Sequence, residues 1–259
     1  MIVSYAILSL VLLTGICWGS FLNVIGYRLM HQDSIFFPKR SYCPSCKQTL
    51  HFVDLIPVFS WIILNGHCRY CKAPISYLYP FIEILTGIAT VILYTHMHTI
   101  FHFIFGFIFC SSLFVITRTD LETMLISQWT TVFLVPIALV ATLVFPLPVV
   151  FFESAIGAFS AYVFLYAISW CYKKYKKCAG IGEGDIEMLC MIGAFLGPVG
   201  WWLTLVLSSF LGSIAALYMF LHAPTNIQNI KIPFGPFLAL GAFITLIWQQ
   251  WVLSLFIPF

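Results

Sequence analysis

The stretch Gly182-Glu183-Gly184-Asp185 leads directly into an apolar run that starts at Ile186 and continues to Gly197. Its two glycines allow the backbone to bend and to approach a neighbouring segment closely. Its aspartate stands at the start of a segment that is apolar enough for a membrane, where a carboxylate is costly. A carboxylate in this position is therefore a functional hypothesis, although an acid at a helix N-terminus is more often a cap or a partner of the helix dipole.

A second aspartate has a similar position. Asp120, in Thr119-Asp120-Leu121-Glu122, follows directly on the apolar run from Ile100 to Ile116. Two aspartates at the ends of different membrane spans can form a pair that shares one proton, which is how aspartic proteases activate water. We therefore interpret Asp120 and Asp185 as a candidate catalytic pair.

The composition indicates a membrane protein. Hydrophobic residues make up 61% of the chain and charged residues 8%, and the mean hydropathy is +1.01. A bilayer core of about 30 Å needs about 20 apolar residues per helix, and the chain has several such runs. We predict an all-α polytopic membrane protein. The net charge of +3 does not indicate a nucleic-acid partner.

The apolar runs predict about eight transmembrane helices. Glycine and proline at Gly193, Gly197, Pro198 and Gly200 predict a tight turn between the sixth and seventh of them. The eight predicted spans are residues 2–25, 77–95, 98–117, 128–146, 149–171, 186–199, 200–221 and 236–256.

Four cysteines lie between the first two predicted spans, in Cys43-Pro44-Ser45-Cys46 and Cys68-Arg69-Tyr70-Cys71. Two C-x-x-C pairs at this separation are typical of a tetrahedral zinc site. The alternative is a pair of disulfides, which requires an oxidising compartment. Four thiolates leave no open coordination position, so we predict one structural zinc ion rather than a catalytic one.

Basic residues predict the orientation in the membrane. With the N-terminus outside, the cytoplasmic segments are residues 26–76, 118–127, 172–185 and 222–235, and these hold every Lys and Arg of the chain. Both termini are then periplasmic, and the cysteine loop, Asp120 and Asp185 all lie on the cytoplasmic side. The twelve residues are Arg28, Lys39, Arg40, Lys47, Arg69, Lys72, Arg118, Lys173, Lys174, Lys176, Lys177 and Lys231.

Several motifs occur together in one order along the chain. They are Gly19-Ser20-Phe21-Leu22-Asn23, the two C-x-x-C pairs, Tyr79-Pro80-Phe81-Ile82-Glu83, Asp120-Leu121-Glu122, Gly182-Glu183-Gly184-Asp185 and Pro233-Phe234-Gly235-Pro236-Phe237. In this order the chain resembles the type IV prepilin peptidase family of bifunctional leader peptidases and N-methyltransferases, which are membrane aspartic proteases of the Gly-x-Gly-Asp class. The resemblance covers nearly the whole sequence.

The resemblance implies that Asp120 and Asp185 are catalytic and that Gly182 and Gly184 support the active-site loop. Such enzymes of the bacterial inner membrane cut the basic leader from prepilins or from pilin-like type II secretion subunits. They then methylate the new N-terminus with S-adenosylmethionine. We predict three parts: a first helix (1–26), a zinc-binding loop domain associated with methyl transfer (27–76) and a peptidase domain (77–259).

The site of methyl transfer is not defined by any motif, since the chain has no glycine-rich dinucleotide loop. Asn23, Arg28 and Glu83 are candidates because they lie near the junction of loop and membrane. Polar groups at helix ends can equally be structural.

The chain also departs from the family pattern. Ser127 stands where a proline is frequent, Thr119 where an apolar residue is usual, and Glu187 where a lysine is frequent. Two other functions stay open: a peptidase without methyl transfer, and a non-enzymatic membrane scaffold whose zinc ribbon binds partners. The sequence does not indicate an oligomeric state.

Overall fold

The structure is a computed structural model that describes residues 2–34, 37, 40–177, 180–222 and 232–256. Lys39 and Lys231, which contributed to the predicted orientation, lie outside the described residues. Every element in the described ranges is a helix, and the only β-type pairings there are two isolated bridges, Tyr42 with Thr49 and His67 with Pro74. The predicted all-α class is confirmed.

The chain forms two compact units, residues 1–98 and 99–259, and each is described by itself. The first unit has two long helices, α1 (Ile2–Met30) and α3 (Leu78–His96), joined by a long loop. That loop contains the four cysteines and two short helices, η1 (Phe52–Leu55) and α2 (Phe59–Ile63).

Small residues hold α1 and α3 together. A Cβ atom at Gly15 would lie 2.6 Å from Thr90 Oγ1, and one at Gly87 would lie 2.5 Å from Ile16 Cγ1. Such distances leave room for glycine only, so the two backbones approach closely, as small residues permit in membrane helices. Gly15 and Gly19 therefore lie on the face of α1 that packs on α3.

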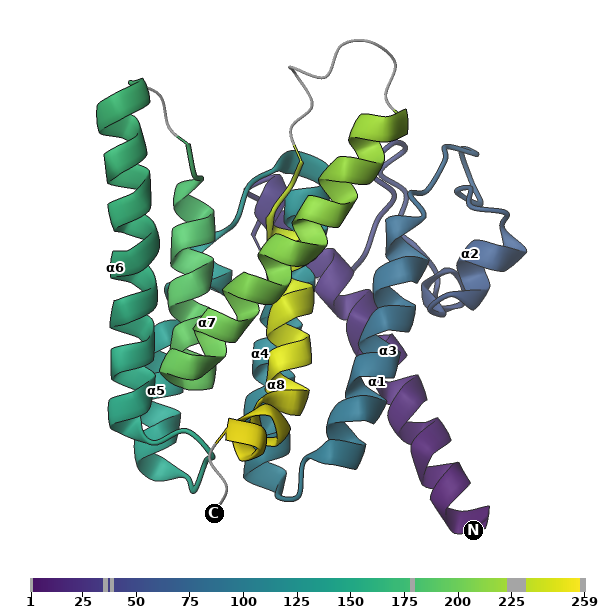
Figure 1. Ribbon diagram of the computed structural model, residues 1–259. Coiled ribbons are helices and arrows are strands. Elements are labelled where there is room, and N and C mark those ends of the chain that lie inside the picture. Colours follow the sequence, from purple (N-terminus) through teal and green to yellow (C-terminus); the bar gives the residue numbers. More distant parts are fainter. Residues whose placement is uncertain (1, 35–36, 38–39, 178–179, 223–231, 257–259) are drawn as a thin grey trace. The chain divides into compact units, whose positions relative to one another are not determined.

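The second unit contains the remaining helices. Two of them, α6 and α7, pack along each other, and α8 contacts both α4 and α7 (Figure 1). The elements are α4 (Ile100–Thr123), η2 (Gln128–Thr130), α5 (Leu134–Val144), α6 (Phe151–Lys176), α7 (Glu183–His222) and α8 (Gly235–Phe256).

Helix α7 is interrupted at Gly197, whose φ of 75° and ψ of −174° are outside the helical region. Glycine adopts this conformation without steric cost, and Pro198 then cannot donate the backbone hydrogen bond of a continuous helix. The two halves of α7 diverge in a V (Figure 1). The turn predicted between the sixth and seventh spans is confirmed at this position.

The number of membrane spans differs from the number of apolar runs. Five described helices are long and apolar enough to cross a membrane: α1, α3, α4, α6 and α7, the last counted with both halves. Helix α5 and the described apolar part of α8 are shorter. The chain is a helical membrane protein, whereas the total of eight spans and the division into functional domains remain predictions.

Candidate active site and metal site

Asp120 lies in the last turn of α4 and is buried, with 5% of its surface exposed. Its Oδ2 accepts a hydrogen bond of 2.9 Å from the backbone N–H of Gly235, the first residue of α8. The first N–H groups of a helix have no partner within the helix. Here one of them fixes the orientation of a buried carboxylate.

Asp185 lies in the first turn of α7. The two glycines of the predicted motif have close neighbours. A Cβ at Gly182 would lie 3.3 Å from Asp185 Oδ2, and a Cβ at Gly184 would lie 2.8 Å from the Cβ of Ile126, in the segment after α4. Gly184 therefore lets the start of α7 pack against the chain that follows Asp120.

The structure places both predicted aspartates in the second unit, where the start of α7, which carries Asp185, packs against Ile126, six residues after Asp120. They come from segments far apart in the sequence, one at a helix end and one at a helix start. Two carboxylates that lie close together can share protons as a pair rather than titrating separately. This arrangement can supply one proton acceptor and one proton donor, as hydrolysis of a peptide bond needs.

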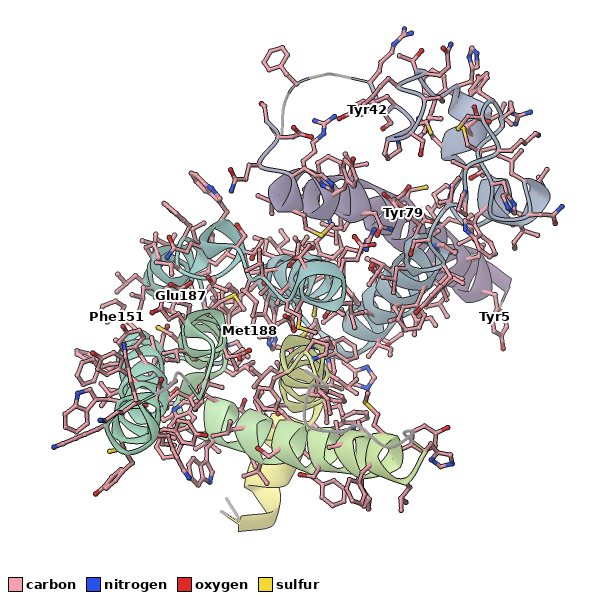
Figure 2. The ribbon with its side chains drawn as sticks, turned by 90° about the horizontal axis from the view of Figure 1, so that it is seen from above. Tyr5, Tyr42, Tyr79, Phe151, Glu187 and Met188 are labelled. Carbon is pink, nitrogen blue, oxygen red and sulfur yellow. The ribbon has the colours of Figure 1, made fainter. Side chains whose placement is uncertain are left out.

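Two departures from the family pattern, Ser127 and Glu187, make local hydrogen bonds. Glu187 is labelled in Figure 2. Glu187, two residues after Asp185, accepts hydrogen bonds from Gln128 Nε2 at 3.0 Å and from Thr131 Oγ1 at 3.3 Å. Ser127 precedes η2, and its backbone carbonyl accepts a bond from the Thr130 hydroxyl, so nothing in the structure explains why a serine stands at this position. Glu187 thus forms a second connection between α7 and the segment after α4.

Gly235 is a site residue that sequence reasoning missed. The motif Pro233-Phe234-Gly235-Pro236-Phe237 contributed to the family resemblance, but no role was assigned to it. A Cβ at Gly235 would lie 2.7 Å from Asp120 Oδ2 and 3.2 Å from its Cγ. Only glycine leaves room for the carboxylate and also places its own N–H against it.

We therefore expect Gly235→Ala to lower the turnover number of the site's hydrolytic reaction by about 100-fold, because displacing a reacting group by about 1 Å has this effect. The Michaelis constant should change little, since the substituted atom contacts the aspartate. The matched control is Gly212→Ala, where the nearest atom to the new Cβ is 3.7 Å away. Thermal unfolding should first show that both variants are folded. Equal turnover numbers in the two variants would then contradict the role of Gly235.

The four cysteines of the first unit form one cluster. Their Sγ atoms all lie within 4.8 Å of one another, and Cys43 Sγ is 3.8 Å from Cys71 Sγ. Because Zn–S bonds are about 2.3 Å long, sulfurs at the corners of a tetrahedron are about 3.8 Å apart. The thiols are free, and none of the cysteines described in the structure forms a disulfide. The donor set therefore fits a tetrahedral metal ion.

The two C-x-x-C turns have the same backbone conformation. In each, the N–H of the lysine after the second cysteine donates to the carbonyl of the first cysteine, at 2.8 Å for Lys47 and 3.1 Å for Lys72. Both lysines are left-handed, with φ of 58° and 59°. Each turn points two sulfurs toward a common centre, and the two turns together complete a four-sulfur site.

The crowded thiols respond differently to their surroundings. Burial raises the pKa of Cys43, but backbone N–H groups of Cys46 and Ser45 and the neighbouring thiols outweigh it and lower that pKa to about 7. The Ala73 backbone favours the Cys71 thiolate, but burial and the other thiols raise the pKa of Cys71 to about 11. A bound cation would favour the thiolate form of all of them.

A cavity of about 300 Å³ lies beside the cysteine cluster, within the first unit. Its walls come from α1, the cysteine loop and the start of α3; Tyr42 and Tyr79, labelled in Figure 2, are two of its lining residues. Cys43 and Cys68 also line it. A cavity whose wall combines apolar and aromatic side chains with charged and hydroxyl groups is typical of a small-molecule site.

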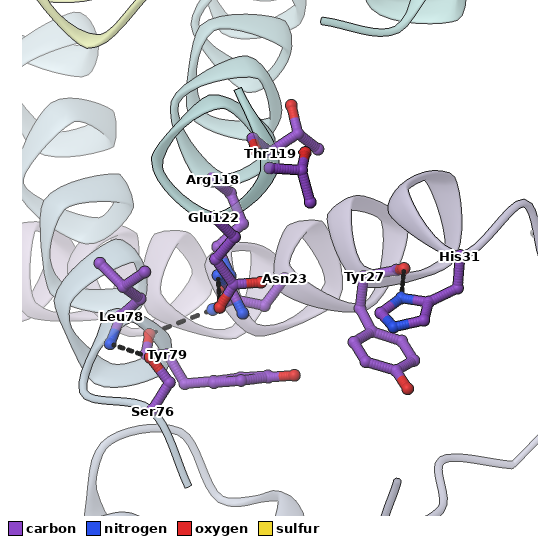
Figure 3. Close-up of polar contacts among 10 residues, drawn as sticks. Asn23, Tyr27, His31, Ser76, Leu78, Tyr79, Arg118, Thr119 and Glu122 are labelled. Carbon is purple, nitrogen blue, oxygen red and sulfur yellow. Dashed lines mark hydrogen bonds and ion pairs between the residues drawn. The ribbon is translucent and has the colours of Figure 1, made fainter. Parts of the chain in front are cut away.

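Two of the three candidates for methyl transfer line this cavity. Arg28 and Glu83 are on its wall, and Glu83 Oε2 accepts a bond of 2.7 Å from the Val58 N–H. Asn23 does not line the cavity. Its side-chain amide donates to the Tyr79 carbonyl at 3.1 Å (Figure 3), so it connects α1 to the start of α3.

Two family models match the chain. The bacterial peptidase A24 N-terminal domain matches residues 13–97, which belong to the first unit. The model described as the type IV leader peptidase family matches residues 107–217, which include both aspartates. No solved structure matches the chain significantly.

Relatives named prepilin leader peptidase/N-methyltransferase match over nearly the full length. The protein from Aeromonas hydrophila is 31% identical, over 96% of this chain and 94% of its own. That from Dichelobacter nodosus is 31% identical over 92% and 90%, and that from Bacillus subtilis 28% identical over 96% and 98%. The chain belongs to the type IV leader peptidase family.

Proposed function

We propose that this protein cuts the leader peptide from type IV prepilins or pilin-like secretion subunits and then N-methylates the new N-terminus. The observation that carries the proposal is the placement of two buried or half-buried aspartates: Gly235 binds the Asp120 carboxylate, and Gly184 packs the helix start that carries Asp185 against Ile126. The full-length relatives named for both activities support it.

Hydrolysis in this proposal is general acid–base catalysis by Asp120 and Asp185. The ionised aspartate takes a proton from water as it attacks the scissile carbonyl, and the protonated aspartate donates to the carbonyl oxygen. The leaving amine then receives a proton from the pair. Because the two carboxylates titrate together, the roles of acid and base belong to the pair.

The proposed location is the bacterial inner membrane, with both termini periplasmic and the cysteine loop and both aspartates at the cytoplasmic face. The confinement of Lys and Arg to four segments of the sequence supports this orientation. A basic leader stays in the cytoplasm by the same rule, so its scissile bond would meet the aspartates at the membrane surface.

For methyl transfer we place the substrate amine and S-adenosylmethionine at the cavity of the first unit. The methyl donor, when bound, supplies an activated methyl group. Arg28 is suited to bind a carboxylate through paired N–H donors. Glu83 is suited to accept a proton from the N-terminal ammonium, so that the neutral amine can attack the methyl group. Asn23 does not line the cavity, but its bond to the Tyr79 carbonyl fixes the position of a residue that does. The four cysteines hold one structural zinc ion.

The two other functions have less support. A peptidase without methyl transfer would not need the cysteine cluster or the cavity beside it. A non-enzymatic zinc-ribbon scaffold would leave two adjacent carboxylates at helix ends without a role, although such groups are costly next to a membrane.

Incubation with a prepilin and S-adenosylmethionine, followed by intact mass measurement, tests the proposal. We expect a product that has lost its leader and gained one methyl group. With an unreactive analogue of the methyl donor, the product should be cleaved but lighter by one methylene, because hydrolysis needs only the aspartates and water.

The order of the two reactions follows from the chemistry, since the amine that is methylated does not exist before cleavage. An analogue that blocked cleavage as fully as methylation would contradict separate sites. A product that kept its leader would contradict the peptidase function itself. Arg28→Lys and Glu83→Gln should reproduce the analogue's effect while leaving cleavage near the wild-type rate.

A further inference from the structure

The loop of the first unit has an apolar outer surface formed by η1 and α2. Phe52 is 91% exposed, Ile63 71% and Phe59 61%. Scattered apolar side chains are normal on a protein surface, but a continuous patch marks an interaction site. The exposed apolar residues of this patch, called here the η1–α2 patch, are Phe52, Val53, Ile56, Phe59, Ile62 and Ile63.

The opposite side of α2 already has a role. Ser60, Trp61 and Leu64 line the cavity of the first unit, so α2 covers the cavity with one side and presents Phe59, Ile62 and Ile63 outward. Within residues 52–66 the only charged side chain is Asp54, and its carboxylate is bonded to Arg69 Nε at 2.6 Å. The outward side is therefore free of unpaired charge.

The depth of the patch follows from one hydrogen bond. The Val58 N–H, directly before α2, donates to Glu83 Oε2 at 2.7 Å, and Glu83 lies inside the apolar span Leu78–His96. At 1.5 Å per residue, Glu83 is about 7 to 8 Å along α3 from Leu78. Its side chain leans back toward the helix start, so Val58 is level with the first two turns of the span. Figure 1 shows α2 beside this part of α3.

The backbone at Val58 shows that this attachment is specific. Val58 has φ of 63° and ψ of −53°, and the Phe59 N–H donates to the Pro57 carbonyl at 2.6 Å. This is a γ-turn of the rare, strained type, at a β-branched residue. Such strain persists only where the surroundings enforce it. The buried Glu83 carboxylate is the group that holds the turn, and with it the start of α2, against α3.

We propose that the η1–α2 patch inserts into the lipid bilayer as an interfacial anchor of the first unit. Interfacial segments bury their apolar side about 5 to 10 Å into the boundary between headgroups and acyl chains, which is the depth deduced above. Tyr77, Phe81 and Ile84, at the same level of α3, are also exposed and apolar, so they extend the lipid-facing surface. The anchor holds the cavity wall at the membrane surface.

The test uses the full-length, zinc-replete protein in lipid nanodiscs. An environment-sensitive fluorescent amino acid replaces Phe59 in one variant and Ile63 in a second. Its fluorescence is measured with either of two quenchers: a lipid with a nitroxide near the ester end of its acyl chain, or a water-soluble nitroxide. We expect the lipid nitroxide to quench at least about threefold more strongly than the aqueous one. The control is the same label at Gln48, an exposed polar position on the first C-x-x-C turn, where the aqueous nitroxide should quench more.

Labels at positions 59 and 63 that behave like the label at position 48 would overturn the proposal. So would labels that the water-soluble nitroxide quenches more strongly before a prepilin is added and that resist both nitroxides afterwards, because the patch would then bind the apolar segment of the substrate. Retained zinc in each labelled variant shows that the loop is folded. The measurement needs no enzymatic activity, so its outcome is independent of the proposed function.

Discussion

Asp120→Asn and Asp185→Asn should each reduce leader cleavage by at least about 10³-fold, since each carboxyl supplies a different proton transfer. The fold should persist, because an asparagine at position 120 can still accept the Gly235 N–H that now binds Asp120 Oδ2. What is lost is the ability to exchange a proton. Gel-based cleavage of a prepilin in detergent or nanodiscs measures the effect.

Two comparisons separate loss of chemistry from loss of structure. Glu183→Gln removes an exposed acid two residues before Asp185 and should keep most of the cleavage rate. Each aspartate variant should still methylate a pilin supplied without its leader, since the cavity proposed for that reaction lies in the first unit. Near-wild-type cleavage by either aspartate variant would mean that hydrolysis does not use this pair.

The candidate active-site loop could be proposed from sequence because its chemistry is local. The spacing of Gly182, Gly184 and Asp185 is a short motif, and Gly184 has a steric reason in the structure. The four cysteines were predictable for the same reason, since two C-x-x-C turns have few other uses. In both cases the type and spacing of the residues restrict the local backbone geometry more than the rest of the protein does.

Gly235 could not be assigned in this way. Its partner, Asp120, is far away in the sequence, and nothing in Pro233-Phe234-Gly235-Pro236-Phe237 indicates which carboxylate its N–H meets. The span count has a related difficulty. Residues 128–146 are apolar enough to suggest a span, yet α5 covers only Leu134–Val144, because hydropathy does not measure helix length.

The position of the loop between the cysteine pairs could not be predicted from sequence, for a different reason. Residues 52–64 are apolar but far too few to span a bilayer, so a search for spans passes over them. Only the bond between Val58 and Glu83 shows that they lie at the level of α3. Likewise, Arg28 and Asn23 have similar positions in sequence, but the structure places only Arg28 on the cavity.

The purified protein should contain about one zinc ion, and Cys68→Ser should remove it, because three thiolates bind far more weakly than four. Structural zinc contributes folding free energy directly, about 10 to 16 kcal/mol in small zinc-binding peptides. We therefore expect the loop from Ser41 to Lys72 to become sensitive to protease. Elemental analysis by mass spectrometry and limited proteolysis measure the two effects.

Cys171→Ser is the matched control, because Cys171 is exposed, free and outside the cluster; it should keep both zinc and the intact loop. Cys43 and Cys68 line the cavity, so loss of zinc should abolish methylation. Cleavage should fall less, since the aspartates belong to the other unit. Freshly isolated protein could instead contain disulfides between Cys43 and Cys46 or between Cys68 and Cys71. The cluster would then be a pair of structural disulfides and not a zinc site, and the zinc content of the wild type should be negligible as well.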